Sequence, residues 1–371
     1  MQMESIETVV IGGGQAGLSV GYQLRQQGRN FVILDAGARV GDSWRNRWDS
    51  LRLFTPAHLD GLAGMRFPGP RGAFPTKDQM GDFLESYARK FELPVRNKVR
   101  VERLARDGAR FVVETADGTI HADNVVVAMS SLGEPRVPDY AAQLAPGITQ
   151  VHSHHYRNLD QLRDGPTLIV GVGNSGADIA MEVATRHTTW LAGTESGAIP
   201  FRIEPFLARH VMMRLVRFVG HRVLTVRTPI GRKIRPMMFS KATPLVRVKP
   251  KDLAAACTRV ARIAGVKDGM PVTEDGQAIE VANVIWCTGY RPGFSWIDMP
   301  ILGDHQEPEH QAGIVADVPG LYFVGLFFLY AMTSETVNGV TRDAKRIVKH
   351  LVARQEQTST RDTVPGQLLP N

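Results

Sequence analysis

Two glycine-rich turns constrain this chain more than any other feature. They cover residues 12–17 and, about 160 residues later, residues 171–176. Each follows an apolar stretch with the pattern of a buried strand and precedes a stretch with helical periodicity. Such a turn presents backbone N–H groups and a helix N-terminus to the phosphates of a dinucleotide. One such turn is weak evidence, but two in one chain predict an α/β fold with two Rossmann-like dinucleotide-binding domains.

The first turn has all the parts of a dinucleotide site. Residues 8–34 follow the order strand, turn, helix, strand, and the second strand ends at Asp35. Gly12 permits the tight turn, Gly14 lets the backbone approach a pyrophosphate, and Gly17 lets the helix pack closely on the strand. Asp35 lies 23 residues after Gly12, at a spacing where a carboxylate can accept a hydrogen bond from a ribose 2′-hydroxyl.

The second turn repeats this pattern between two further apolar strands. Gly171, Gly173 and Gly176 occupy the corresponding places. Asn174 and Ser175 add polar groups that suit a phosphate. We therefore expect a second dinucleotide here; the alternative is a fold element that has lost its ligand.

The choice between NADH and NADPH stays open. The spacing that leads from Gly12 to Asp35 leads in the second half to Thr194, which Glu195 follows. A carboxylate suits a free 2′-hydroxyl, whereas a 2′-phosphate needs arginine. We expect no arginine at this strand end, because the nearest in the sequence are Arg186 and Arg202.

The cysteine and histidine content excludes several kinds of site. The chain has two cysteines and no Cys-x-x-Cys motif, so a thiol redox pair and a disulfide framework are not expected. His152, His154 and His155 lie close together, but no cysteine or downstream ligand pair accompanies them, and we expect no metal. The first strand begins almost at the N-terminus, and the longest apolar run has 12 residues, so we expect a cytoplasmic protein without a signal peptide.

Positive charge is concentrated in residues 205–251, which contain twelve Lys or Arg and no Asp or Glu. Residues 207–223 predict an amphipathic helix that Gly220 interrupts. Three roles stay open for this basic segment: a lid on the nicotinamide domain, a peripheral contact with an anionic membrane, and a subunit interface or solvated face. No nucleic-acid motif accompanies it, so no nucleic-acid partner is expected. The polar tail from Gln355 is expected to be frayed.

The strongest family signal is residues 41–56, GDSWRNRWDSLRLFTP. This stretch resembles the one after the second strand in class B flavin-dependent monooxygenases, which include plant enzymes acting on indole-pyruvate and bacterial proteins related to them. The resemblance continues in the same order at residues 74–79, 83–88, 174–176, 284–292 and 320–325. The family motif Phe-x-Gly-x-x-x-His-x-x-x-Tyr keeps only His152 and Tyr156 at their spacing, and residues 128–130, Ala-Met-Ser, stand where members often have Ala-Thr-Gly.

The resemblance implies an FAD-containing, NAD(P)H-dependent monooxygenase. In such two-dinucleotide-binding flavoproteins, nicotinamide passes hydride to the flavin, and a C4a-(hydro)peroxyflavin formed with O2 passes one oxygen atom to a small molecule. Because the flavin carries the chemistry, no catalytic residue is assigned, and Lys77 and His152 are candidates only. The alternatives are an NAD(P)H-dependent reductase or oxidase that passes electrons to a quinone, a ferredoxin or O2, and a non-enzymatic nucleotide sensor.

The turns and the resemblance together indicate which residues hold the cofactors. Trp44 could instead pack its loop with Trp48, Lys77 could be a solvated loop cation, and Val101 could be an ordinary strand residue. The expected FAD residues are Gly12, Gly14, Gln15, Ala16, Gly17, Asp35, Ala36, Trp44, Arg45, Thr55, Val101, Ala128, Gly289, Gly325 and Asn338. The expected NAD(P)H residues are Gly171, Gly173, Asn174, Ser175, Gly176, Thr194, Glu195 and Thr288.

The same order of motifs predicts a discontinuous first domain. We expect the FAD-binding domain to comprise residues 1–160 and 281–371. The NAD(P)H-binding domain would comprise residues 161–280 and carry the basic helical insertion 205–251. The oligomeric state stays open.

Overall fold

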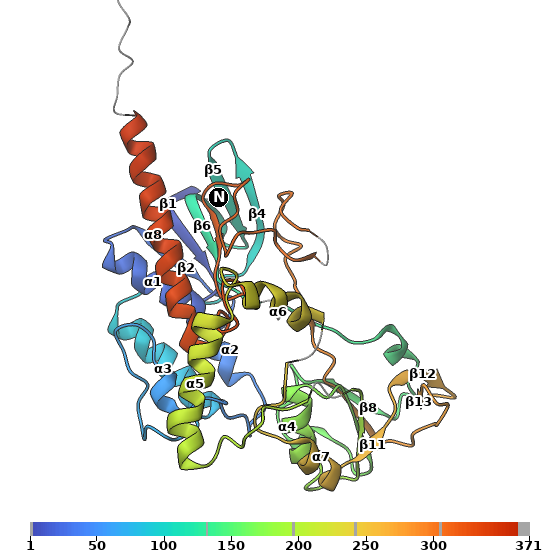
Figure 1. Cartoon of the computed structure of the whole chain (residues 1–371). Helices are drawn as coiled ribbons and strands as arrows, with labels where there is room; N and C mark the ends of the chain where they lie inside the picture. Colours follow the sequence, from blue (N-terminus) through green and yellow to red (C-terminus); the bar gives the residue numbers. More distant parts are fainter. Residues whose placement is uncertain (1–2, 131–132, 195–196, 241–242, 304–305, 363–371) are drawn as a thin grey trace, which may run out of the picture.

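The chain folds into two lobes, each built on its own sheet (Figure 1). The computed structural model describes residues 3–130, 133–194, 197–240, 243–303 and 306–362. Within these residues, no helix is long and apolar enough to cross a membrane.

The first sheet has seven strands in the order β3-β2-β1-β6-β5-β4, with β16 paired to the C-terminal half of β6. Its central strands are parallel, whereas β4 and β5 form an antiparallel extension on β6. The strands are β1 (Met3–Ile11), β2 (Phe31–Leu34), β3 (Val95–Arg96), β4 (Val101–Asp107), β5 (Arg110–Thr115), β6 (Gly118–Val127) and β16 (Leu321–Phe323).

Three helices pack together beside the first sheet. α1 (Gln15–Gln26) contacts both α8 (Val337–Asp362) and α3 (Lys77–Lys90). Thr76 begins α3 with a capping box, because its hydroxyl accepts from the Gln79 N–H while the Gln79 side chain accepts from the Thr76 N–H. The core that these helices share includes Leu18, Leu24 and Tyr87, which are completely buried. Between β2 and α3 lie the short helices α2 (Asp42–Arg45) and η1 (Ala57–Leu59).

The second sheet has five parallel strands in the order β11-β10-β9-β14-β8. They are β8 (Thr149–His152), β9 (Thr167–Val170), β10 (Thr189–Ala192), β11 (Thr258–Val260) and β14 (Asn283–Trp286). The helices of this lobe are η2 (Asp139–Gln143), η3 (Leu159–Gln161), α4 (Asn174–Val183) and α7 (Pro250–Ala256), and β12 (Ile263–Lys267) forms a hairpin with β13 (Met270–Thr273). The expected α/β fold with two Rossmann-like sheets is confirmed.

Paired strands and a buried side chain hold the lobes together. β7 (Glu134–Pro135), where the chain leaves the first lobe, pairs with β15 (Tyr290–Arg291), where it returns. Trp48, from the loop after β2, is buried in the core of the second lobe with Tyr156 and Ile169. The domain boundaries at residues 160 and 281 stay a prediction; β8 and β14, which they would assign to the first domain, pair with each other in the second sheet.

The basic segment forms two helices that pack on the first lobe. The π-helical turns η4 (Ala208–Met212) and η5 (Val219–Val223) flank α5 (Met213–Phe218) without a break, and α6 (Pro229–Ser240) follows. The expected interruption at Gly220 is therefore wrong. Gly220 lies inside η5, and a Cβ there would come within 2.6 Å of Met332 Cε, so glycine permits the close approach of that side chain.

The tail expectation is also wrong in part, since α8 continues to Asp362. Arg354 holds this stretch, because its guanidinium donates to Asn124 Oδ1 on β6 at 2.6 Å. The next residue, Gln355, accepts a hydrogen bond from Arg29. These contacts keep this stretch helical, although its polar composition alone predicts a frayed end.

Candidate cofactor sites

The two glycine turns have the same backbone geometry. Gly12 and Gly171 each have φ near 108°, which favours glycine. A Cβ on Gly17 would lie 1.8 Å from the Gly12 carbonyl oxygen, and one on Gly176 would lie 2.0 Å from the Gly171 oxygen. The third glycine of each turn therefore allows the helix to begin directly against the turn, as expected from the sequence.

The middle glycine of each turn faces open space, which fits a pyrophosphate. Gly14 and Gly173 are the N-cap residues of α1 and α4, and neither helix has a side-chain cap or an acidic residue in its first turn. A Cβ on Gly14 would have Ser43 Oγ, 3.8 Å away, as its nearest neighbour, and one on Gly173 would contact nothing within 4 Å. Free N–H groups and the positive end of a helix dipole thus point into room for an anion at both turns.

Asp35 lies beside the first turn, as expected for a ribose contact. Its Oδ1 accepts from the Gly37 N–H at 2.8 Å, and its Oδ2 accepts from the Gly13 N–H at 2.5 Å. These bonds hold the carboxylate, with Ala36 next to it, at the end of β2. Val99 donates its N–H to the Asp35 carbonyl at 2.9 Å, whereas Val101 lies in β4 opposite Thr115.

Several expected FAD residues surround the first turn. Ala128 donates its N–H to the Ile11 carbonyl, and a Cβ on Gly325 would lie 2.8 Å from the Ala16 methyl. Trp44 Nε1 donates to Gln15 Oε1 at 3.2 Å, and the same amide donates to the Glu335 carbonyl at 3.3 Å.

Glu335 is a site residue that the sequence did not indicate. It immediately precedes Thr336 and α8, close to the expected FAD residue Asn338, whose Oδ1 accepts from the Thr336 hydroxyl at 3.2 Å. Loss of water raises the pKa of the Glu335 carboxyl to about 7. Nothing in the local sequence indicates the contact of the Glu335 carbonyl with Gln15, 320 residues earlier in the chain.

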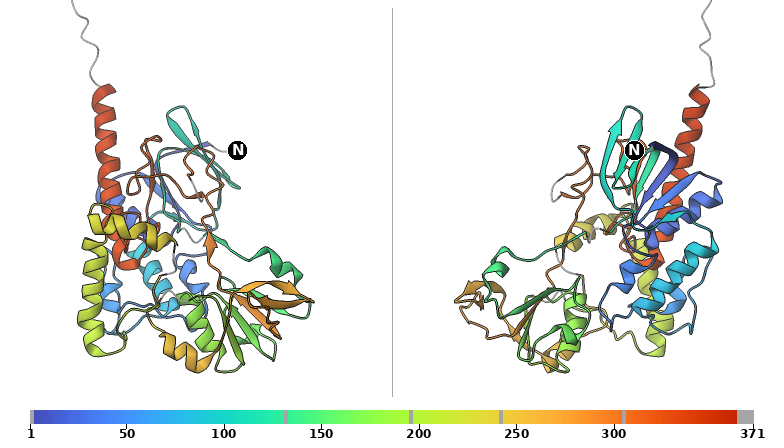
Figure 2. Two further views of the ribbon diagram at one scale, coloured as in Figure 1. Left: turned by 45° about the vertical axis from the view of Figure 1, so that its right-hand side comes forward. Right: turned by 180° about the vertical axis from the view of Figure 1, so that it is seen from behind.

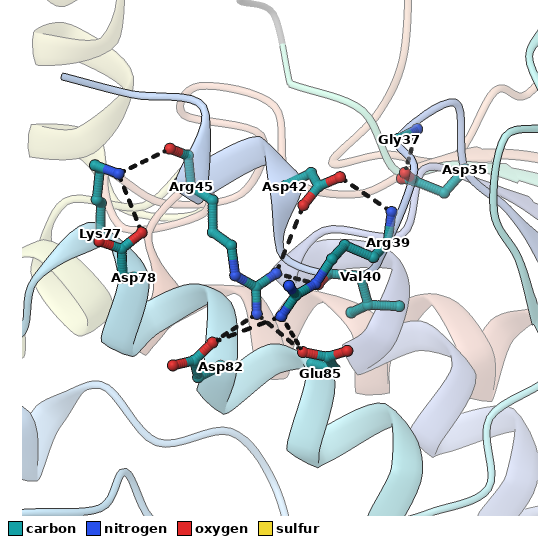
Figure 3. Close-up of polar contacts among 10 residues, drawn as sticks. All are labelled: Asp35, Gly37, Arg39, Val40, Asp42, Arg45, Lys77, Asp78, Asp82 and Glu85. Carbon is teal, nitrogen blue, oxygen red and sulfur yellow. Dashed lines mark hydrogen bonds and ion pairs between the residues drawn. The ribbon is translucent and has the colours of Figure 1, made fainter. Parts of the chain in front are cut away.

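Arg45 and Lys77 hold the loop after β2 rather than facing solvent (Figure 3). The Arg45 guanidinium donates to the Val40 carbonyl at 2.7 Å and to Asp82 and Glu85 of α3 at 2.8 and 3.0 Å. Both terminal nitrogens of the guanidinium therefore donate to acceptors in the protein. The side chain of Arg45 thus fastens the loop to α3.

Lys77 is buried, so the alternative that it is a solvated loop cation is wrong. Its Nζ donates to the Arg45 carbonyl and to Asp78 Oδ1, both at 3.0 Å, and lies 3.5 Å from Asp49 Oδ1. A buried ammonium with three oxygen partners stabilises the loop that leads to Trp48.

Thr55 has a partner that the sequence did not indicate. Its hydroxyl donates to Asp60 Oδ1. Asp60 is completely buried, and its second oxygen has no partner among the described residues. Burial raises the pKa of this carboxyl to about 7.

Asn174 has a structural contact instead of a free amide. Its Oδ1 accepts from the Val246 N–H at 2.9 Å, and its Nδ2 donates to the Pro244 carbonyl at 3.1 Å. The side chain therefore fixes the chain that returns from the basic segment, while the neighbouring Ser175 lies half-buried in the first turn of α4.

Two arginines lie at the end of β10, so the expectation of none is wrong. Arg262 Nε donates to Thr194 Oγ1 at 3.2 Å, and Arg259 donates to the Gly193 carbonyl at 2.7 Å. Both come from β11 and the loop after it, because β11 pairs with β10. Glu195 lies outside the described residues.

The linker between the lobes holds His152 firmly. Its Nδ1 accepts from the His154 N–H and its Nε2 lies 3.1 Å from the Gly289 carbonyl, which places the proton on Nε2. Burial lowers the pKa of His152, which favours the neutral imidazole. Thr288, beside Gly289, donates its hydroxyl to the Arg136 carbonyl. Among the described residues, no group of three or more His, Cys, Asp or Glu side chains is placed to hold a metal ion.

Comparisons with known proteins agree with this geometry. Residues 9–198 match the family model described as pyridine nucleotide-disulphide oxidoreductase. The uncharacterized oxidoreductase CzcO-like of Geobacillus kaustophilus is 36% identical over 94% of this chain and 98% of its own length. The flavin-containing monooxygenase from Stenotrophomonas maltophilia is 30% identical, with a TM-score of 0.75, over 95% of this chain and 99% of that one. The chain belongs to the class B flavin monooxygenase-like family.

A plant relative agrees with this membership. Indole-3-pyruvate monooxygenase YUCCA1 of Oryza sativa subsp. japonica is 27% identical over 92% of this chain and 90% of its own length. This flavin monooxygenase-like protein is therefore a flavin-dependent oxidoreductase, and its family uses a flavin together with a nicotinamide nucleotide.

Proposed function

We propose that the chain is an FAD-containing, NAD(P)H-dependent monooxygenase that oxygenates a small molecule through a C4a-(hydro)peroxyflavin. The observation that carries the proposal is the pair of turns with one geometry, one in each of the two sheets of a single chain. Both have open space and free N–H groups at the middle glycine. Redox chemistry between two bound dinucleotides needs this pairing, and two of the similar proteins, from Stenotrophomonas maltophilia and Oryza sativa subsp. japonica, are named as monooxygenases.

The residues of the first lobe would hold FAD. The first turn and the N-terminus of α1 would bind its pyrophosphate, and Asp35 would accept from its adenine ribose. When bound, the flavin would supply the electron transfer and the reaction with O2. Trp44 and Gln15, which are hydrogen-bonded to each other, would close the loop over this site and exclude water, and Arg45 and Lys77 would fix that loop from behind.

We also infer that the second site prefers NADPH. Arg259 and Arg262 bring two guanidinium groups to the end of β10, where the adenosine ribose of a dinucleotide lies in Rossmann-like domains. Arginine pairs with a phosphate through two parallel hydrogen bonds. Arg262→Gln should raise the KM for NADPH by about tenfold or more and leave the KM for NADH nearly unchanged. Equal changes for both coenzymes would contradict the inference.

The oxygenase assignment is tested by the reaction of the reduced protein with O2. In stopped-flow experiments with oxidised nicotinamide present, the proposal predicts a long-lived absorbance of a C4a-oxygen adduct before the oxidised flavin returns. Immediate reoxidation with one peroxide per flavin would instead indicate a reductase or oxidase. A chain that binds no flavin and turns over no nicotinamide would indicate a sensor.

A further inference from the structure

Among the residues that the structure describes, most of the exposed large apolar side chains lie in the basic segment. Among the described residues, nine large apolar side chains are exposed, and eight of them lie between Phe206 and Phe239. Phe206 exposes 78% of its surface and Phe218 exposes 58%. Isolated apolar side chains on a surface are ordinary, but a concentration in one segment marks a contact with something else.

The helix of α5 has two apolar faces. Its inner face packs on the first lobe, where Met213 joins Leu59 and Ile203 in a small core. The outer face carries Leu207, Val211, Leu215 and Phe218 at helical spacing, and all four are exposed. In the left view of Figure 2, α5 (yellow-green) runs along the outer edge of the molecule. The inner face accounts for the fold, and the outer face remains without a partner.

Exposed cations accompany this outer face. Arg214, Arg217 and Arg222 are exposed on the same helix, and Arg227, Arg232 and Lys233 are exposed in and before α6. Within the part of the chain that the structure describes, no carboxylate forms an ion pair with these six cations. Ile230 and Met237 of α6, seven positions apart, are exposed as well. The pattern of apolar side chains interleaved with arginine is that of a helix lying in a membrane interface.

Contacts with the first lobe hold the two helices in place. Thr225 bridges to Ala331, and the Val226 N–H donates to the Tyr330 carbonyl at 2.9 Å. Phe239 packs edge-on against Phe327 at 5.1 Å between ring centroids. The surface is therefore mounted rigidly on the stretch that leads to α8, and little ordering would be needed for it to dock.

We propose that α5 and α6 dock the protein on an anionic membrane surface, with the outer apolar side chains in the headgroup region and the arginines on lipid phosphates. A second copy of the chain is a poorer occupant, because two-fold contact would bring two carboxylate-free basic surfaces together. The proposal rests on this surface alone and is independent of the oxygenase chemistry.

Vesicle co-sedimentation of the full chain with its bound flavin tests the proposal. Binding should be strong to vesicles that contain phosphatidylserine, weak to pure phosphatidylcholine, and reduced by high salt. Leu215→Ser with Phe218→Ser, and separately Arg214→Gln with Arg217→Gln, should each lower binding by about tenfold or more. Val137→Ser and Arg89→Gln, an exposed apolar residue and an exposed cation elsewhere, are the matched controls and should bind as wild type.

We expect all the variants to fold, because the substituted side chains are exposed. Visible spectra and unfolding curves would verify this. No binding to phosphatidylserine vesicles by the wild type would overturn the proposal. So would equal binding to neutral vesicles, or a concentration-dependent dimer that Phe218→Ser dissolves while vesicle binding is absent. Loss of flavin chemistry with vesicle binding intact would affect the proposed function and leave the docking proposal standing.

Discussion

Two alanine substitutions in the first turn should affect different properties: one the stability of the fold, the other the affinity for FAD. In Gly17→Ala the new Cβ would lie 1.8 Å from the Gly12 carbonyl oxygen and 3.0 Å from its carbon. A carbon–oxygen contact needs about 3.3 Å, so α1 would have to shift by roughly 1.5 Å away from its turn. Because both atoms belong to the backbone, we expect the free energy of unfolding of the flavin-free protein to fall by about 3 kcal/mol.

Gly14→Ala should have the opposite profile. The backbone at Gly14 is extended, with φ −77° and ψ −170°, and its Cβ would have no atom nearer than 3.8 Å. We expect the flavin-free stability to change by less than about 1 kcal/mol. FAD affinity should fall by about tenfold or more, because the methyl group would occupy the approach of the pyrophosphate.

Urea unfolding of the flavin-free variants and fluorescence titration with FAD measure these two quantities. Gly173→Ala, whose Cβ would contact nothing within 4 Å, is the matched control in the second turn and should leave FAD binding unchanged. The reasoning would be refuted if Gly14→Ala bound FAD like wild type, or if Gly17→Ala were as stable as wild type.

Three further substitutions test the contacts around the loop after β2. Since burial raises the pKa of Asp60 to about 7, the folded protein keeps a proton there that the unfolded chain has released. Stability should therefore fall from about pH 4 to about pH 7, by at most about 1.4 kcal/mol per pH unit, and Asp60→Asn should flatten that part of the urea-unfolding profile. Lys77→Met should destabilise the protein by about 2 kcal/mol because it leaves a carbonyl and carboxylates without their donor; an unchanged urea midpoint would count against the loop role. Trp48→Ala should cost about 3 kcal/mol in the second lobe, detected as earlier unfolding of that lobe in hydrogen exchange.

Local sequence was sufficient for both glycine turns, because each role depends on neighbours within a few residues. The close approach of Gly17 to Gly12, and of Gly176 to Gly171, follows from the spacing alone. The strand that ends at Asp35 is equally local.

The rest of the site could not be predicted from the sequence, because it depends on contacts between residues far apart in the chain. The arginines at the end of β10 come from β11 and the loop after it, 66 and 68 residues after their partners Gly193 and Thr194, and their position depends on strand order. The partners of Lys77 depend on how the loop folds back on α3, and a completely buried Asp60 resembles any polar loop residue in the sequence. The extension of α8 past Gln355 likewise depends on contacts with β6 and α1.

Anaerobic mixing of the flavin-loaded protein with NADPH or NADH tests the central claim most directly, because it requires both turns to hold their ligands within one chain. We predict that the purified chain binds one FAD and that its visible absorbance bleaches on mixing, faster with NADPH. An absorbance that stays that of oxidised flavin with either coenzyme, or a chain that takes up no FAD, would contradict the account.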